Sequence, residues 1–248
     1  MLKYIDSILR TFRPCFSREA TFRWFVIIIL GLIPRPDRLG VTTSVMRALS
    51  LPVRCYKKCH QFFRFEAWSL KSLRQTWLRI VKNKAPLIRY NGKVVLVGDG
   101  VKQAKEARRM PAVKKLHQES ENNSKALYIF GDLFGAVGIL MGTPQKGFCL
   151  PLFINLQDGI KTIFGWNKQK NPSRLESYVV QMIEQGFNTA RVFGNALLLL
   201  DRYFLSVPAL KRLNQLQKSE NPQMHLVTKA KKNAVAYEHP PVKKKGRE

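Results

Sequence analysis

The pattern of apolar and polar residues changes near residue 86. Before this point, apolar residues recur at helical spacing in the ranges 41–49 and 68–81, and basic residues fill the positions between them. After it, runs of Val, Ile, Leu and Phe alternate with turn signals such as Asn91-Gly92, which is typical of a tight β-hairpin. We therefore predict a basic helical domain over residues 1–85, a sheet-containing domain over 86–235, and a basic tail over 236–248.

The second domain is predicted to follow the order three strands, helix, strand, helix, strand. The expected strands are 93–97, 127–142, 148–156, 196–200 and 225–228, and the expected helices begin at Ser173 and at about residue 207. Three consecutive strands favour an antiparallel meander, and a helical crossover makes the fourth strand parallel to its partner. The fold class predicted from this pattern is α/β (α+β), with a mixed sheet and flanking helices.

Two of the apolar runs end on a single aspartate. Val94-Val95-Leu96-Val97-Gly98 is followed by Asp99, and Ala196-Leu197-Leu198-Leu199-Leu200 is followed by Asp201. A continuous apolar run predicts a strand buried on both faces of a sheet, which can present a carboxylate only at its end. If the two strands are parallel neighbours, Asp99 and Asp201 lie side by side and can hold one divalent cation through oxygen ligands. The alternative for each aspartate is a turn or helix cap.

Positive charge is spread over the whole chain. The 43 Lys and Arg residues against 16 Asp and Glu residues give a net charge of +27, of which residues 1–90 contribute +14, residues 91–218 +9 and residues 219–248 +4. Such a charge attracts polyanions, because neutralised phosphates release counterions. Nucleic acid is the expected partner, and solubility or a structural role on RNA is the alternative. The expected phosphate contacts are Lys102, Lys105, Arg108, Arg109, Lys114, Lys115 and Arg202.

Several other classes of protein are disfavoured. Four cysteines without a signal peptide indicate a reducing, intracellular compartment. Cys55-x3-Cys59-His60 is half of a metal motif without a second half, so we interpret these cysteines as packed or spare thiols. The apolar run 25–33 is too short to span a bilayer and 126–142 contains Asp132, so both are expected in cores and no membrane partner is expected. Phosphate-binding and dinucleotide-binding glycine loops are missing from the sequence.

The residues around the two aspartates resemble a known family. The segments Val97-Gly98-Asp99-Gly100-Val101-Lys102 and Leu-Leu-Leu-Leu-Asp201-Arg-Tyr-Phe204 are similar to those of bacterial insertion-sequence transposases with a DDE catalytic domain, and the similarity runs from Thr21 to Lys232. The resemblance implies a ribonuclease H-like fold in which Asp99 and Asp201 are the first two acids of a triad. The triad would hold Mg²⁺ or Mn²⁺ for nicking and strand transfer at transposon ends, by a homodimer in the bacterial cytoplasm, associated with the nucleoid.

The third acid of the triad is the point at which the sequence departs from the family. A Glu is expected on a helix after the fifth strand, and the candidates are Glu220, Glu238 and Glu248. Glu238 follows Asp201 by 37 residues, but Pro240-Pro241 prevents a regular helix there. The resemblance therefore implies that this chain stops before its third acid, with Glu238 as a weak candidate. Asp132 is a second departure, since related sequences tend to carry Gly-His in place of Gly131-Asp132.

Three functions remain open from the sequence. The first is a DDE transposase, complete or truncated. The second is a DNA-binding protein without catalysis, in effect a truncated transposase that occupies transposon ends and acts as an inhibitor. The third is a structural RNA-binding protein whose aspartates only cap turns, and it predicts no divalent-metal binding at Asp99 and Asp201.

Overall fold

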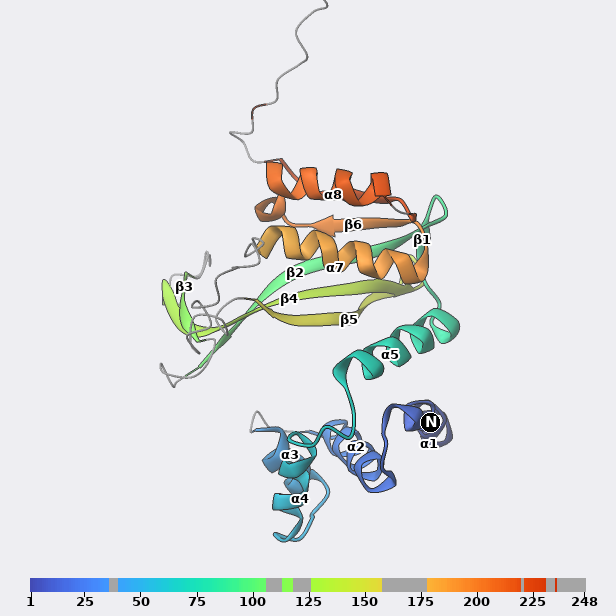
Figure 1. The fold of residues 1–248 in the computed structure, drawn as a ribbon, viewed down its shortest axis with the longest axis vertical. Helices are drawn as coiled ribbons and strands as arrows, with labels where there is room; N and C mark the ends of the chain where they lie inside the picture. The colour runs from blue at the N-terminus through green and yellow to red at the C-terminus, as the bar shows by residue number, and fades with distance from the viewer. Residues whose placement is uncertain are drawn as a thin grey trace, which may run out of the picture. The chain divides into compact units, whose positions relative to one another are not determined.

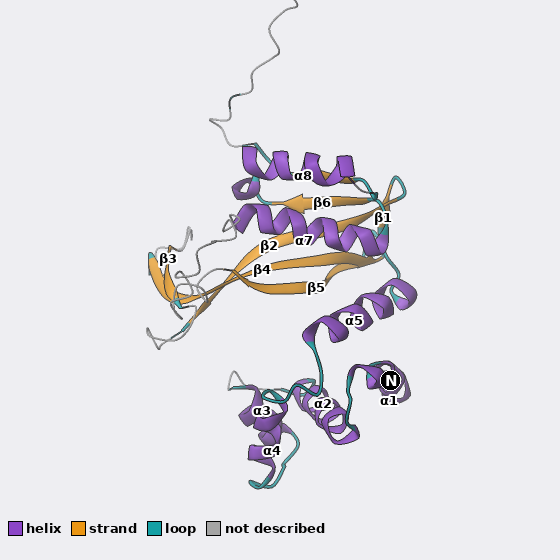
Figure 2. Ribbon diagram, viewed as in Figure 1, coloured by secondary structure: helices purple, strands orange, loops and turns teal. Residues whose placement is uncertain are grey.

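The computed structural model describes residues 1–35, 40–105, 113–117, 126–157, 178–219, 221–230 and 235 (Figures 1 and 2). Contacts within the chain divide it into two compact units, Met1–Pro86 and Leu87–Glu248. Several residues with an expected role lie outside the described part, namely Arg108, Arg109, Ser173, Glu220, Glu238, Glu248, the tail 236–248 and the side chain of Lys114.

The first unit is helical, as its apolar spacing predicts. Its helices are α1 (Leu2–Thr11), α2 (Glu19–Leu32), α3 (Val41–Ala48), α4 (Cys55–Phe62) and α5 (Leu70–Lys84), with a short 3-10 helix at Arg13–Cys15. The helices expected over 41–49 and 68–81 are confirmed as α3 and α5. Helix α5 begins after Ser69, whose side chain accepts a hydrogen bond from the Ser72 N–H and so caps the helix.

The core of the first unit is built largely from aromatic side chains. Phe12, Phe16 and Phe62 are buried in it together with Ile28 and Val45. Only part of the apolar run 25–33 enters this core: Ile28 is buried, whereas Leu30 and Ile33 are exposed. The expectation that the whole run is core is therefore wrong, because α2 presents only one side to α3 and the neighbouring aromatic rings. Among the described helices, none is both long enough and apolar enough to cross a membrane.

The described part of the second unit contains a seven-stranded mixed sheet. Its strands are β1 (Arg89–Tyr90), β2 (Lys93–Ala104), β3 (Lys114–His117), β4 (Tyr128–Gly142), β5 (Gly147–Gln157), β6 (Ala196–Leu200) and β7 (Met224–Val227). The order is β3-β4-β2-β6-β7, with β1 beside β2 and β5 beside β4. Strands β2, β4 and β5 are antiparallel neighbours, and β6 is parallel to both β2 and β7. The expected meander followed by a parallel strand is confirmed.

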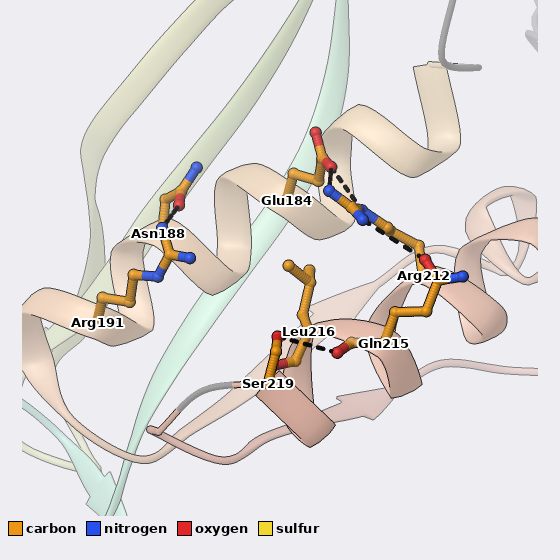
Figure 3. Close-up of polar contacts among 7 residues, drawn as sticks. All are labelled: Glu184, Asn188, Arg191, Arg212, Gln215, Leu216 and Ser219. Atoms are coloured by element: carbon orange, nitrogen blue, oxygen red, sulfur yellow. Dashed lines mark hydrogen bonds and ion pairs between the residues drawn. The ribbon is translucent and has the colours of Figure 1, made fainter. Parts of the chain in front are cut away.

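Two helices flank the sheet, α7 (Tyr178–Phe193) and α8 (Val207–Ser219), with a 3-10 helix η3 (Arg202–Phe204) after β6. Helix α7 lies close to β2 and β6: a methyl group added at Gly186 would lie 2.6 Å from the Leu198 Cδ2 atom. Helix α8 is tied to α7 by a polar contact in which Arg212 Nε donates to Glu184 Oε1 at 2.6 Å (Figure 3). The fold of this unit is thus a mixed α/β sheet with flanking helices.

Strand β2 is longer than the sequence predicts. It does not end at Asp99 but continues to Ala104, paired with β4 from Asp99↔Ala136 to Ala104↔Gly131. Residues 101–104 and 114–117, which lie outside the strands expected from the sequence, belong to β2 and β3. The physical reason is that β6 ends at Leu200, so that beyond Gly98 strand β2 is paired on one side only and becomes exposed. A carboxylate is tolerated inside this strand because its environment there is no longer buried.

Candidate functional site

Asp99 lies within β2 and Asp201 directly follows β6, and these two strands are paired in parallel. The register of β2 with β6 runs from Val94↔Ala196 to Gly98↔Leu200, and the two aspartates are the next residues on their respective strands. Because parallel strands of equal register reach the same level of a sheet, the two carboxylates leave the sheet at neighbouring positions. The condition on which the sequence prediction depended, that these strands are parallel neighbours, is met.

Each aspartate makes the same local hydrogen bond. The Gly100 N–H donates to Asp99 Oδ1, and the Arg202 N–H donates to Asp201 Oδ1, both at 2.7 Å. Both residues are exposed. The bond uses one oxygen of each carboxylate, and among the described residues the other oxygen accepts no hydrogen bond. For Asp201 this bond also caps η3, which is the structural role that the sequence left open as an alternative.

Both aspartates line one cavity of about 440 Å³. Two lysines from the strands beyond Asp99, Lys102 and Lys115, line the same cavity. The rest of its wall is formed by Gly100, Leu116, His117, Leu133, Tyr178, Tyr203 and Phe204. Two aspartates and two lysines therefore line one shared cavity.

The two lysines are held in place by their neighbours. Lys102 Nζ donates to the His117 backbone oxygen at 2.6 Å, so the side chain bridges β2 and β3. Lys115 Nζ lies 4.3 Å from the centroid of the Tyr128 ring, a cation–π distance. Ammonium groups fixed in this way beside carboxylates suit a ligand that carries negative charge of its own.

Not every basic residue expected at the site reaches the cavity. Lys105 Nζ lies 3.8 Å from Asp132 Oδ2, and neither residue is part of the cavity wall. Arg202 is exposed on η3 and is likewise not part of the wall. Asp132 faces Gln103 across the β2–β4 pairing, several residues along β2 from Asp99. The structure therefore does not bring this extra carboxylate to the pair formed by Asp99 and Asp201.

Tyr178 is a residue of the site that the sequence reasoning missed. It is the first described residue of α7, and its ring lies near two other aromatic rings of the wall, with centroids 5.3 Å from Phe204 and 6.3 Å from Tyr203. Burial, and then the negative charge of Asp99, raise the pKa of the Tyr178 hydroxyl. The one trace of this contact in the sequence is Gly100, directly after Asp99. A side chain at position 100 would collide with the Tyr178 hydroxyl, so the contact requires a glycine there.

The chemistry of the donor atoms fits a hard divalent cation. Mg²⁺ and Mn²⁺ prefer oxygen ligands, and Mg²⁺ is commonly held by one or two carboxylates while it keeps several waters and binds a substrate phosphate. Asp99 and Asp201 offer that arrangement. Within the described ranges, no group of three or more His, Cys, Asp or Glu side chains lies close enough to hold a metal ion, the Cys55–Cys59–His60 motif included.

Comparison of the chain with known protein families, with curated proteins and with solved structures finds no match. The functional argument therefore rests on the residues of the cavity. Those residues combine two neighbouring carboxylates, two fixed ammonium groups and an aromatic wall in one space.

Proposed function

We propose that the protein is a DDE-type DNA transposase, a metal-dependent enzyme that nicks DNA at transposon ends and transfers strands. The observation that carries the proposal is the placement of Asp99 in β2 and of Asp201 directly after β6, the parallel neighbour of β2, where both residues line one cavity. The mixed sheet, in which a meander is followed by parallel strands, is compatible with the ribonuclease H-like fold that we propose for this unit.

Each charged residue of the cavity has a role in this proposal. Asp99 and Asp201 would hold Mg²⁺ or Mn²⁺, and the bound cation would activate the attacking oxygen and stabilise the leaving oxygen of the phosphate. Lys102 and Lys115 bind the non-bridging oxygens or the adjacent phosphates of the DNA strand and so hold the strand against the cavity.

The rest of the chain supplies affinity for DNA. Residues 1–90 carry 18 basic and 4 acidic residues, so the helical unit adds a strong attraction to the phosphate backbone that is independent of base sequence. Two transposon ends require two active sites, and we propose that a homodimer forms on DNA.

The Asp201→Asn variant tests the catalytic role. We expect DNA affinity to be unchanged or slightly raised, because one negative charge near the phosphates is removed, and Mg²⁺-dependent nicking to be lost. Binding is measured by fluorescence anisotropy, and nicking by conversion of supercoiled plasmid. Asp132→Asn, which removes a carboxylate outside the cavity, is the matched control and is expected to nick as the unaltered chain does. Nicking retained in Asp201→Asn would contradict the assignment.

A second function is favoured by two observations: the described residues bring only two acidic side chains to the cavity, and Asp201 also caps η3. In this alternative the protein binds nucleic acid without cutting it, as an inhibitor at transposon ends or as a structural RNA-binding protein. The unaltered chain would then bind nucleic acid and show no nicking with any divalent cation. Competition between duplex DNA and structured RNA of equal length separates these two non-catalytic roles.

A further inference from the structure

The hydroxyl of Tyr178 is a buried polar group that makes no hydrogen bond within the part of the chain that the structure describes. Its oxygen is shielded from solvent and has no hydrogen-bond partner among the described residues. A buried hydroxyl in this state is destabilising, and native proteins retain few of them. The aromatic neighbours Tyr203 and Phe204 hold the ring in place without offering the hydroxyl an acceptor.

The Tyr178 hydroxyl lies near Gly100, the residue that directly follows Asp99. A methyl group added at Gly100 would lie 2.3 Å from the Tyr178 oxygen, so the phenol occupies the space that a side chain at position 100 would need. Asp99 is the preceding residue, lines the same cavity, and is near enough for its charge to raise the pKa of the phenol. A tyrosine hydroxyl carries its proton at neutral pH, so the phenol is a hydrogen-bond donor that lines the same cavity as this carboxylate-bearing residue.

The Asp99 carboxylate has an oxygen that can accept such a bond. Oδ1 accepts from the Gly100 N–H, and Oδ2 is the second acceptor. Carboxylates that hold a metal ion are themselves held by hydrogen bonds from a second layer of residues, which fix their orientation.

We propose that Tyr178 is a positioning residue for Asp99, whose carboxylate accepts a hydrogen bond from the Tyr178 hydroxyl when it binds a divalent cation. The inference rests on the proposed function, since the cation is the one assigned there to Asp99 and Asp201. Gly100 is part of the same arrangement, because only a residue without a side chain leaves room for the Tyr178 phenol beside β2.

The experiment measures Mn²⁺ binding to the full chain by electron paramagnetic resonance, together with the thermal unfolding midpoint. For Tyr178→Phe we expect Mn²⁺ affinity to fall by about 10-fold to 100-fold, the range typical when such a supporting hydrogen bond is removed. The unfolding midpoint is expected to stay the same or rise, because the variant removes an unsatisfied buried hydroxyl. Tyr90→Phe is the matched control, since it removes a hydroxyl from an exposed tyrosine of the same unit that does not line the cavity, and its Mn²⁺ affinity should equal that of the unaltered chain.

Two further variants separate the possible failures. If Asp99→Asn weakens Mn²⁺ binding but Tyr178→Phe binds within about twofold of the unaltered chain, the role of Tyr178 is overturned and the metal site stands. If the unaltered chain binds no Mn²⁺, or Asp99→Asn binds it equally well, the proposed metal site fails and the role of Tyr178 fails with it. Gly100→Ala displaces the hydroxyl by a different route and should lower Mn²⁺ affinity even if Tyr178→Phe folds poorly.

Discussion

At the scale of single residues, some positions of the site are packed so closely against a neighbour that no larger side chain fits. Gly100 is the clearest case, because its missing side chain is replaced in space by the Tyr178 hydroxyl from α7. Asp99 and Asp201 are oriented alike, each by the N–H of the residue that follows it. The sequence identified both aspartates, whereas Tyr178 became a site residue only through a contact between elements far apart in the chain.

The close contact between Gly100 and Tyr178 predicts coupling between variants. Gly100→Ala should destabilise the protein by about 1–3 kcal/mol, because the added methyl forces the ring to move. In the Tyr178→Phe background the effect should be smaller, since the nearest remaining ring atom, Cζ, lies 3.3 Å from the added methyl. A double-mutant cycle by chemical denaturation measures the coupling. Additive free energies of unfolding would show that the two residues do not meet.

At the scale of elements, burial alternates from residue to residue along β6, although its sequence is apolar throughout. The run 196–200 is wholly apolar and predicts burial on both faces, but Leu198 is fully buried and its neighbours Leu197 and Leu199 are only half-buried. The face of Leu198 lies against α7, where Gly186 makes room for it. The expectation of burial on both faces therefore holds only in part: one face of β6 is fully buried and the other is partly buried within the described part of the chain.

This asymmetry predicts different effects for adjacent leucines of β6. Leu198→Ala should destabilise the protein by about 2–5 kcal/mol, as for other fully buried leucines. Leu197→Ala removes the same atoms from a half-buried position, so its effect should be clearly smaller. Urea unfolding of the two variants measures the difference in free energy of unfolding. Equal losses would mean that both faces of β6 are covered to the same extent.

At the scale of the whole molecule, the net charge of +27 outweighs any local group of acids. Asp99 and Asp201 bring negative charge to one cavity of an otherwise basic chain, and Lys102 and Lys115 stand beside them. The net positive charge of the chain attracts the phosphate backbone of a nucleic acid. The two carboxylates repel phosphate, so a cation is needed between them and a phosphate group. In the proposed function, the net charge accounts for the affinity for DNA and the cavity for the cation-dependent chemistry.

The whole-molecule charge predicts a steep dependence of DNA binding on salt. Between about 50 mM and 200 mM salt, affinity for duplex DNA should fall by about 10³-fold or more, as for proteins that neutralise several phosphates. Replacement of both Lys102 and Lys115 by Ala should reduce the slope of log K against log salt by about 2, because each phosphate contact contributes about one. Lys146→Ala, an exposed lysine outside the cavity, is the comparison and should reduce it less. An unchanged slope in the double variant would show that Lys102 and Lys115 do not contact DNA phosphates.

The sequence by itself determined the order of elements and most of the charged residues of the site. The Asn91-Gly92 turn, with φ angles of 47° and 75°, the helices α3 and α5, and the strands β4, β5 and β6 follow from local spacing and turn chemistry, which neighbouring residues decide. Asp99 and Asp201 stand out because each ends a run of apolar residues, whereas Lys102 and Lys115 were named among the basic residues expected to contact phosphate.

Only the tertiary structure decided how these residues meet. The parallel pairing of β2 with β6 places Asp201 beside Asp99, the early end of β6 lets β2 continue through Asp99, and α7 brings Tyr178 to Gly100. It also shows that Lys105 and Arg202 do not line the cavity. Pairing partners, register and helix placement arise from contacts between distant parts of the chain, and the periodicity of a single segment carries no information about them.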